Sequence, residues 1–314
     1  MEKRMKRIYR SVLELVGNTP LVALERYAAE QGLEGTLLAK VERGNPGGSV
    51  KDRVAVHMLD TAEAEGKLRP GAVIIEPTSG NTGVGLAMAA AVRGYRMIVT
   101  MPETMSVERR KLIAAYGAQI VLTPGSEGMS GAVRRAEELQ AETPGSWIAS
   151  QFDNPANPAA HENTTGPELW RDTDGQIDAF VAGVGTGGTL SGTARYLKKQ
   201  NPSIEIVAVE PATSPLLSCG YAGKHDLQGI GANFIPKNLD RSLIDRIIPV
   251  TDEEAYAASR LLAKREGLLC GITSGAAAHA AAALLREPAY RGKTVVALLP
   301  DTGERYLSTK LFQE

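Results

Sequence analysis

Residues 45–53 read Asn45-Pro46-Gly47-Gly48-Ser49-Val50-Lys51-Asp52-Arg53, and the apolar pattern that follows them is helical. Ser49 and Asp52 form an S-x-x-D pattern, which predicts a helix that begins here with Ser49 as its N-cap. Lys51 then lies in the first turn, where the helix dipole disfavours a positive charge. A lysine that is more easily neutral can serve as a nucleophile, although an ordinary capped helix is the commoner meaning of such a motif.

The composition is that of a globular protein with a sizeable core and balanced charge. The chain has 314 residues, 43% of them hydrophobic, and its 35 basic residues nearly match its 36 acidic ones. We therefore expect no nucleic-acid or membrane surface. No apolar segment follows the basic start Met1–Arg7, so we expect no secretory signal. Cys219 and Cys270 lack the spacing of metal ligands, which favours free thiols in the cytoplasm and no metal site, with one disulfide as the alternative.

Short apolar strands alternate with helices along both halves of the chain. The predicted strands span residues 36–42, 72–76, 97–100, 119–122, 177–182, 204–210, 247–250 and 294–299. This alternation predicts an α/β fold with two domains, each a mostly parallel sheet flanked by helices. The chain becomes polar and rich in Pro and Asn from Ser150 to Pro158, where we expect it to cross from one domain to the other.

A first polar loop, Pro77-Thr78-Ser79-Gly80-Asn81-Thr82-Gly83, follows a predicted strand and opens a helix. Free amides at a helix start, together with hydroxyls and the Asn81 amide, suit a carboxylate or another small oxyanion. A plain capping turn is the alternative.

A second loop carries the pattern G-x-G-x-x-G between a strand and a helix. It reads Gly183-Val184-Gly185-Thr186-Gly187-Gly188-Thr189, and Glu210 ends the next predicted strand. The pattern indicates either a dinucleotide site with Glu210 near a ribose, or a phosphate cup for a smaller cofactor. A glycine turn for close packing is the structural alternative. A third loop, Gly271–Gly275, offers the hydroxyls of Thr273 and Ser274 to a neutral ring nitrogen, unless they only cap the helix.

If these loops and Lys51 face one pocket, a reactive amine, a carboxylate site and a phosphate site coexist. That set is what pyridoxal phosphate needs to act on an amino acid. The chain resembles the cysteine synthases (O-acetylserine sulfhydrylases) of the β-family of pyridoxal-phosphate enzymes. The resemblance rests on the motifs at residues 17–22, 49–53, 77–83, 151–155, 164–168, 185–189, 228–232 and 303–308, in family order over nearly the whole chain.

The resemblance implies the fold type II architecture, which is like that of the tryptophan synthase β-subunit. It implies a smaller, mobile domain over residues 45–150 that carries the Asn81 loop. Residues 1–44 and 151–314 would form the larger domain with the phosphate cup. Pyridoxal phosphate would lie in the cleft between the two domains.

The resemblance also implies roles for individual residues. Lys51 would hold the cofactor as a Schiff base and later take the α-proton of the substrate. The cofactor would contact Lys51, Asn81, Gly185, Thr186, Gly187, Gly188, Thr189 and Thr273. The substrate would contact Thr78, Ser79, Gly80, Asn81, Thr82, Gln151 and Gly229. Thr273 replaces the usual serine opposite the pyridine nitrogen, which leaves open whether Thr273 or Ser274 makes that contact.

The implied reaction replaces the acetate of O-acetyl-L-serine by sulfide and gives L-cysteine through an α-aminoacrylate intermediate. A neutral hydroxyl at the ring nitrogen favours such elimination over transamination. The resemblance also implies a homodimer in the cytoplasm, to which the C-terminal tail of a serine acetyltransferase could bind.

Three other functions remain open from the sequence. Homocysteine could replace sulfide, as in a cystathionine β-synthase, or the enzyme could be a serine/threonine dehydratase. Thiosulfate is a further possible nucleophile. The chain ends at Glu314, where we expect no regulatory module, and this favours the synthase. From another class, the glycine pattern fits an NAD(P)-dependent oxidoreductase. The step Pro300-Asp301-Thr302-Gly303 has no interpretation from the sequence alone.

Overall fold

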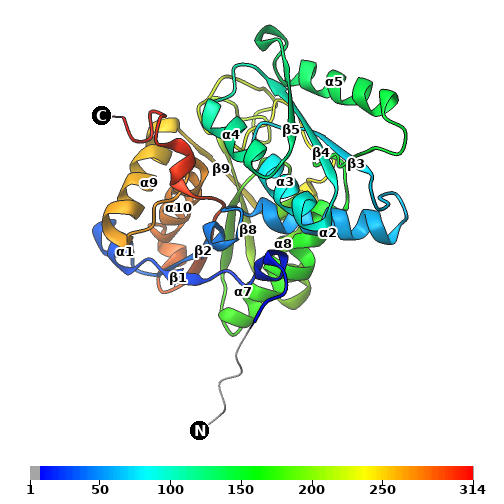
Figure 1. The fold of residues 1–314 in the computed structure, drawn as a ribbon. Coiled ribbons are helices and arrows are strands. Elements are labelled where there is room, and N and C mark those ends of the chain that lie inside the picture. Colours follow the sequence, from blue (N-terminus) through cyan, green and yellow to red (C-terminus); the bar gives the residue numbers. More distant parts are fainter. Residues whose placement is uncertain (1–7, 314) are drawn as a thin grey trace.

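The computed structural model describes residues 8–313, which form two α/β units side by side (Figure 1). The basic segment Met1–Arg7, in which we expect no secretory signal, lies outside the described residues. The larger unit holds a six-stranded sheet in the order β1-β2-β10-β7-β8-β9. Only β1 and β2 pair antiparallel. The strands are β1 (Leu21–Ala23), β2 (Thr36–Val41), β7 (Ala179–Gly183), β8 (Glu205–Pro211), β9 (Arg246–Val250) and β10 (Thr294–Leu299).

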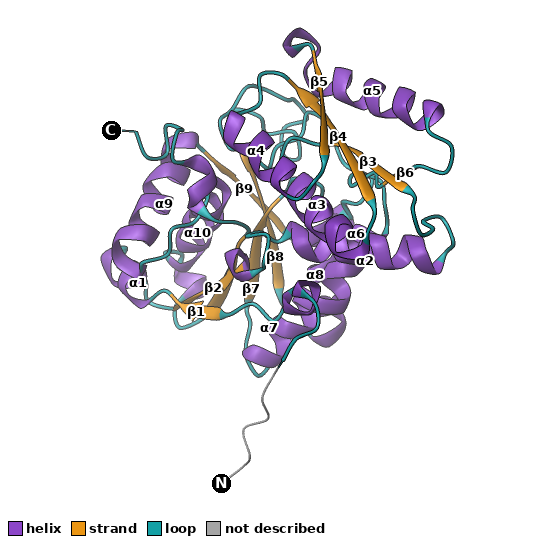
Figure 2. Cartoon of the chain, in the orientation of Figure 1, coloured by secondary structure: helices purple, strands orange, loops and turns teal. Residues whose placement is uncertain are grey.

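The smaller unit holds a parallel four-stranded sheet in the order β5-β4-β3-β6. Figure 2 shows the two sheets apart, with helices between and around them. The strands are β3 (Val73–Pro77), β4 (Arg96–Pro102), β5 (Gln119–Thr123) and β6 (Trp147–Ile148). Its helices are α2 (Lys51–Ala64), α3 (Asn81–Arg93), α4 (Val107–Ala115) and α5 (Gly128–Glu142).

The remaining helices accompany the larger sheet. They are α1 (Glu25–Glu30), α6 (Ala156–Ala160), α7 (Gly166–Asp172), α8 (Gly188–Gln200), α9 (Asp252–Glu266) and α10 (Ile272–Leu285), with a π-helical turn at His161–Thr165. Short 3-10 turns occur at Val12–Leu15, Glu42–Gly44, Gly125–Glu127, Arg241–Leu243, Pro288–Tyr290 and Gly303–Tyr306.

Both faces of the larger sheet are buried, as its continuous apolar strands require. Along β10, Val295 and Ala297 pack into one core with α9 and α10, whereas Val296 and Leu298 pack into another with α7 and α8. Successive residues of a strand point to opposite faces, so an unbroken apolar strand needs a helical layer on each side. The predicted α/β fold of mostly parallel sheets flanked by helices is confirmed.

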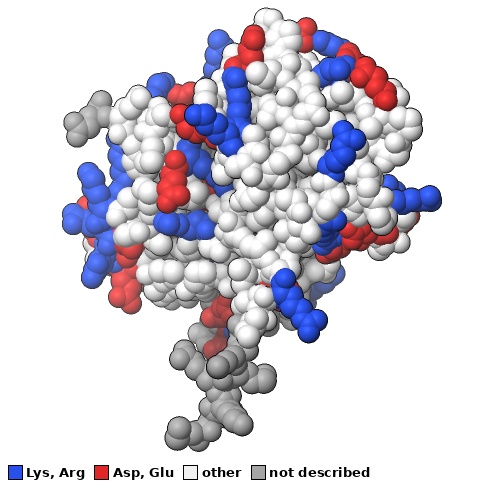
Figure 3. Space-filling model, in the orientation of Figure 1, with Lys and Arg blue, Asp and Glu red and all other residues white. Residues whose placement is uncertain are grey.

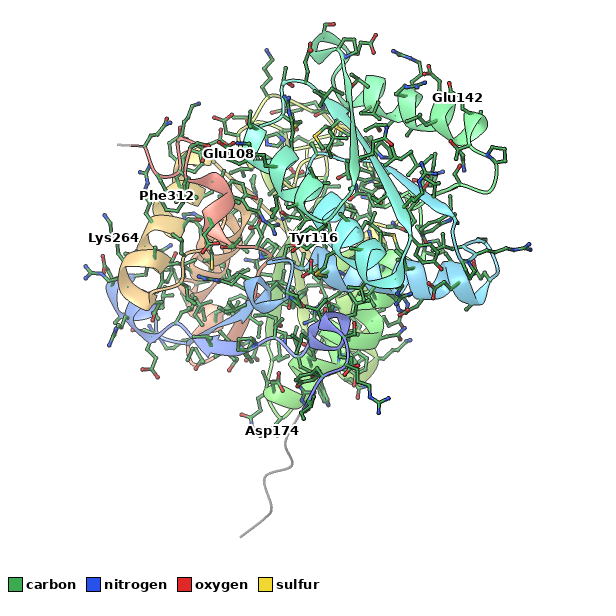
Figure 4. The ribbon with its side chains drawn as sticks, viewed as in Figure 1. Glu108, Tyr116, Glu142, Asp174, Lys264 and Phe312 are labelled. Carbon is green, nitrogen blue, oxygen red and sulfur yellow. The ribbon has the colours of Figure 1, made fainter. Side chains whose placement is uncertain are left out.

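The smaller sheet is covered in the same way. Ile74, Met97 and Val99 pack with α2, α3 and α4, while Ile75 and Ile98 face Ala136 of α5 on the other side. In Figure 4 the side chains of Glu142, at the end of α5, and Lys264, on α9, lie at opposite edges of the molecule. The loops of the candidate site, which lie before α2, α3, α8 and α10, are between these two edges.

Within residues 8–313 no helix is both long enough and apolar enough to span a lipid bilayer. On the face drawn in Figure 3, basic and acidic side chains lie among one another.

Candidate active site

Lys51 is the first residue of α2, and a tight turn before it sets the helix start. Gly48 has a φ of +79°, which a residue with a side chain adopts only with strain. Ser49 pairs with Asp301 in an isolated bridge, and the Val50 amide donates to the Pro300 carbonyl at 2.8 Å. The chain that follows β10 therefore fixes the start of α2 and the place of Lys51.

The predicted S-x-x-D cap at this helix is wrong in its details. The N-cap residue is Val50, and the Ser49 hydroxyl accepts only from the Lys51 amide, at 3.2 Å. The Asp52 carboxylate turns back and accepts from the Gly47 amide at 2.5 Å. A contact with the Pro-Gly-Gly turn therefore takes the place of the reciprocal cap.

Lys51 is half-buried, and its surroundings favour the neutral amine. Burial lowers the pKa of the Lys51 amine, and the negative charge of Asp301 opposes that shift. A charged group loses solvation when it is buried, so its neutral form becomes more accessible near neutral pH. Lys51 is therefore suited to act as a nucleophile or a base.

A buried charge network anchors the helix that carries Lys51. Arg53 lies 2.7 Å from both Glu42 and Glu168, and Lys40 lies 2.8 Å from Glu168. Burial acts to raise the pKa of Glu168, but the hydrogen bonds and charges of Arg53 and Lys40 lower it to about 2. Two positive and two negative charges thus balance one another and tie α2 to β2 and α7.

The Asn81 loop joins β3 to α3 and is rich in polar groups. The helix has Gly80 as its N-cap and no side-chain cap, and a Cβ placed on Gly80 would meet no atom within 4 Å. Thr78 and Thr82 are buried, and Ser79 is half-buried. The open space at Gly80 and the uncapped helix start can accommodate a small anion.

Gln151 lies beside this loop and is held from several sides. The Thr82 hydroxyl donates to Gln151 Oε1 at 2.6 Å, and the Gln151 carbonyl accepts from Asn157 and Asn238. The buried carboxylate of Glu76 accepts from the amides of Ser150 (2.9 Å) and Gln151 (3.3 Å). Burial raises the pKa of Glu76 to about 7. These contacts place Gln151 where the Asn81 loop meets the larger unit.

The glycine-rich loop between β7 and α8 leaves several amides free. Within residues 8–313, the amides of Gly185, Thr186 and Gly187 donate no hydrogen bond, and α8 has no side-chain cap. The glycines are needed for close packing, because a Cβ on Gly188 would lie 2.0 Å from Asn157 Oδ1. Thr189 is buried, and its hydroxyl contacts His161 Nε2 at 3.2 Å. Free amides at a helix start form a phosphate site.

The dinucleotide alternative for this loop is wrong. It requires the Glu210 carboxylate to be free for a ribose. Glu210 is buried and accepts hydrogen bonds from the amides of Leu217 (2.7 Å) and Ser218 (3.1 Å). The Glu210 carboxylate therefore stabilises the loop that follows β8 and is not accessible to a ligand.

The third loop also presents buried hydroxyls. Thr273 and Ser274 lie in the first turn of α10 and are 3% and 0% exposed. Within the described residues, Ser274 Oγ has no hydrogen-bond partner. Gly229 lies beside Thr273, since a Cβ on Gly229 would be 3.8 Å from Thr273 Cγ2. Thr273 stays our predicted partner of a ring nitrogen, with Ser274 as the alternative.

Contacts between the loops bring the predicted residues into one region. Asn157 donates to both the Gln151 carbonyl (2.8 Å) and Thr186 Oγ1 (2.9 Å), which connects the Asn81 loop to the phosphate cup. A Cβ on Gly185 would lie 2.3 Å from the Gly229 carbonyl oxygen, so the cup also meets the Gly229 loop. These loops carry Lys51, Asn81, Gly185 and Thr273. Each loop follows, or lies next to, the carboxyl end of a parallel strand, and ligands bind at these ends in α/β sheets.

Three charged residues to which the sequence analysis assigned no role also lie in this region. Asp301 accepts from Asn81 Nδ2 at 2.8 Å, and Arg305 donates to Asn81 Oδ1. Arg109 of α4 donates to Gln228 Oε1 at 2.5 Å. Asp301 lies just beyond the last strand of the sheet, after Pro300, and that position was the one available signal.

The residues present fit pyridoxal phosphate. Burial lowers the pKa of the Lys51 amine and so makes its neutral form more accessible. Within residues 8–313, the amides before α8 are free to bind a phosphate, and a buried hydroxyl of α10 lacks a partner. No group of His, Cys, Asp or Glu side chains that could hold a metal ion occurs within the described part of the chain.

Comparisons with known proteins indicate the same cofactor. Residues 12–301 match the family model described as pyridoxal-phosphate dependent enzyme. A cysteine synthase of Staphylococcus aureus is 54% identical over 303 residues, which cover 96% of each chain. A crystal structure of a cysteine synthase from Entamoeba histolytica superposes with a TM-score of 0.95 at 44% identity, covering 99% of this chain and 93% of that one. An O-ureido-L-serine synthase superposes with a TM-score of 0.93 at 46% identity, covering 98% and 96%.

Proposed function

The chain belongs to the pyridoxal-phosphate-dependent enzymes, and we propose that it replaces the acetate of O-acetyl-L-serine in the cleft beside Lys51. It is an enzyme of the cysteine synthase type, with pyridoxal phosphate as its cofactor and L-cysteine and acetate as its products when sulfide is the second substrate. The observation that carries the site assignment is the half-buried Lys51 amine with a lowered pKa, on a helix start fixed against the end of β10.

The cofactor would be held by residues of three loops. The free amides from Gly185 to Thr189 would bind its phosphate, Asn81 its ring hydroxyl and Thr273 its ring nitrogen. When bound, pyridoxal phosphate supplies an electron-withdrawing ring that stabilises negative charge at the α-carbon of an amino acid. A neutral hydroxyl at the ring nitrogen moderates that withdrawal and favours loss of a β-substituent.

The chain's own residues would bind the amino acid and move its proton. The start of α3 would hold the carboxylate through Thr78, Ser79, Gly80, Asn81 and Thr82, with Gln151 beside them. Lys51 would remove the α-proton as the neutral amine that its burial favours, and the acetate would then leave. The lowered pKa makes the neutral amine of Lys51 easier to reach than that of an exposed lysine.

We infer further that residues 45–150 form a domain that moves against the rest, and that the enzyme is a cytoplasmic homodimer. Both cysteines of the chain are free thiols, which suits a reducing compartment. The C-terminal tail of a serine acetyltransferase is a candidate partner at the mouth of the cleft. Sedimentation of the purified protein would test the dimer, and a monomer at assay concentration would contradict it.

A steady-state assay of Lys51→Ala tests the function. We expect the wild-type protein to be yellow and to use sulfide better than thiosulfate or homocysteine, and Lys51→Ala to lose turnover. Lys67→Ala is the matched control, because Lys67 is an exposed lysine that follows the same helix and pairs with Glu65. Full activity of Lys51→Ala would overturn the assignment, and a preference for homocysteine would move the enzyme to the cystathionine β-synthase reaction.

A further inference from the structure

Asp301 lies where the main loops of the site meet. It lies just beyond the end of β10, after Pro300, and is 1% exposed. It forms a bridge with Ser49, two residues before Lys51, and its carbonyl accepts from the Gly271 amide at 3.1 Å. Its main chain thus joins the start of α2 to the start of α10, and its side chain lies at that junction.

The Asp301 carboxylate binds the Asn81 amide across the two units. Its Oδ2 accepts from Asn81 Nδ2 at 2.8 Å and from the Tyr306 hydroxyl at 2.6 Å. Its Oδ1 has no hydrogen-bond partner within residues 8–313, and it packs against Gly271, where a Cβ would lie 2.1 Å away. Burying a carboxylate oxygen without a partner costs folding free energy, which is typical of residues kept for function.

The carboxyl group of Asp301 and the guanidinium of Arg305 decide which way the Asn81 amide points, because the first presents an acceptor oxygen and the second presents donors. An ionised carboxylate only accepts hydrogen bonds and a guanidinium only donates them. Asp301 therefore takes the nitrogen end of the amide, and Arg305 Nη1 takes the oxygen end. Arg305 also donates to the Gly47 carbonyl, so it is itself held by the turn before Lys51.

We propose that Asp301 is a positioning residue that holds the Asn81 amide in one orientation and leaves its second Nδ2 hydrogen free to donate to the cofactor. The inference rests on the proposed function, in which Asn81 binds the ring hydroxyl of pyridoxal phosphate. Without Asp301 the amide loses its acceptor and can rotate, and the free hydrogen no longer points in a fixed direction. The Tyr306 hydroxyl holds the carboxylate in turn.

A double-mutant cycle between Asp301 and Asn81 tests the proposal in the holoenzyme. A residue that acts only through another has no effect once that other residue is removed. The variants are Asp301→Ala, Asn81→Ala and the double variant. The readouts are kcat and KM for O-acetyl-L-serine, the dissociation constant of pyridoxal phosphate, and the visible circular dichroism of the bound cofactor.

We expect Asp301→Ala to weaken cofactor binding or kcat by about 10- to 100-fold, as loss of a hydrogen bond to a charged group does. We expect the double variant to match Asn81→Ala in all three readouts. Multiplicative losses in the double variant would overturn the proposal. Asp60→Ala, which removes an exposed carboxylate of α2 that pairs with Arg93, serves as the control and should leave the readouts unchanged.

The conservative variant keeps the proposal testable if Asp301→Ala does not fold. Asp301→Asn retains one oxygen that can accept from Asn81, so we expect it to recover most of the circular dichroism signal and of kcat. A loss of kcat or of cofactor affinity in Asp301→Asn as large as 100-fold would contradict the proposal if Asn81→Ala, combined with it, lowered these values further. A wild-type protein without a visible chromophore would instead contradict the proposed function.

Discussion

At the scale of single residues, the site depends on groups whose ionisation burial has changed. Lys51 and Glu76 illustrate both directions: burial lowers the pKa of the amine and raises that of the carboxyl. The amine gains reactivity from this shift. The carboxyl group of Glu76 accepts hydrogen bonds from the Gln151 loop. Because its pKa is raised in the folded protein, the stability of the protein depends on pH.

Glu76→Gln should change how stability depends on pH. A pKa raised from 4.5 to about 7 means that wild-type folding is favoured while Glu76 is protonated, and that this advantage is lost as the pH rises through 7. Relative to Glu76→Gln, the wild type should lose about 3 kcal/mol of unfolding free energy between pH 4.5 and pH 8. Urea unfolding at both pH values measures the difference, and an equal gap at the two pH values would contradict it.

The sequence predicts Lys51, Asn81 and the Gly185 loop because each signal is local: small polar residues between an apolar strand and a helix. Asp301 and Arg305 gave no such signal. They meet Asn81 across more than 200 positions of the chain, and only the packing of one unit against the other creates that contact.

At the scale of elements, helix α2 was predicted correctly, but the capping of its first turn was predicted wrongly. The helix was predictable from its apolar pattern, and it runs from Lys51 to Ala64. The cap was not, because the Gly47 amide competes for the Asp52 carboxylate through a turn whose geometry the sequence does not specify. The helix is held in place by the Arg53 network more than by its cap.

Arg53→Ala should therefore destabilise the protein strongly. It leaves the buried carboxylates of Glu42 and Glu168 without their main partner, and breaking a buried ion pair in this way costs about 3–5 kcal/mol. Arg93→Ala breaks exposed pairs with Asp60 and Glu63 and should cost about 1 kcal/mol or less. Urea midpoints of the two variants measure the contrast, and similar losses would show that the network does not anchor α2.

At the scale of the whole molecule, the site is assembled by two sheets. The smaller unit contributes Lys51 and the Asn81 loop, and the larger unit contributes the amides before α8 and the hydroxyls of α10 (Figure 1). The alternation of strands and helices was enough to predict both sheets, because parallel sheets buried on both faces need continuous apolar strands. How closely the two units approach depends on tertiary contacts such as that of Arg109 with Gln228, which no local pattern indicates.

We propose that Lys51 is the residue that holds the cofactor. Borohydride reduction of the holoenzyme fixes pyridoxal phosphate to the lysine that carries it, and digestion with mass spectrometry then identifies the modified peptide. We predict that the modification lies on the peptide containing Lys51 and is absent from Lys51→Ala. A modification on another lysine, or a yellow protein with Lys51 unmodified, would contradict the account.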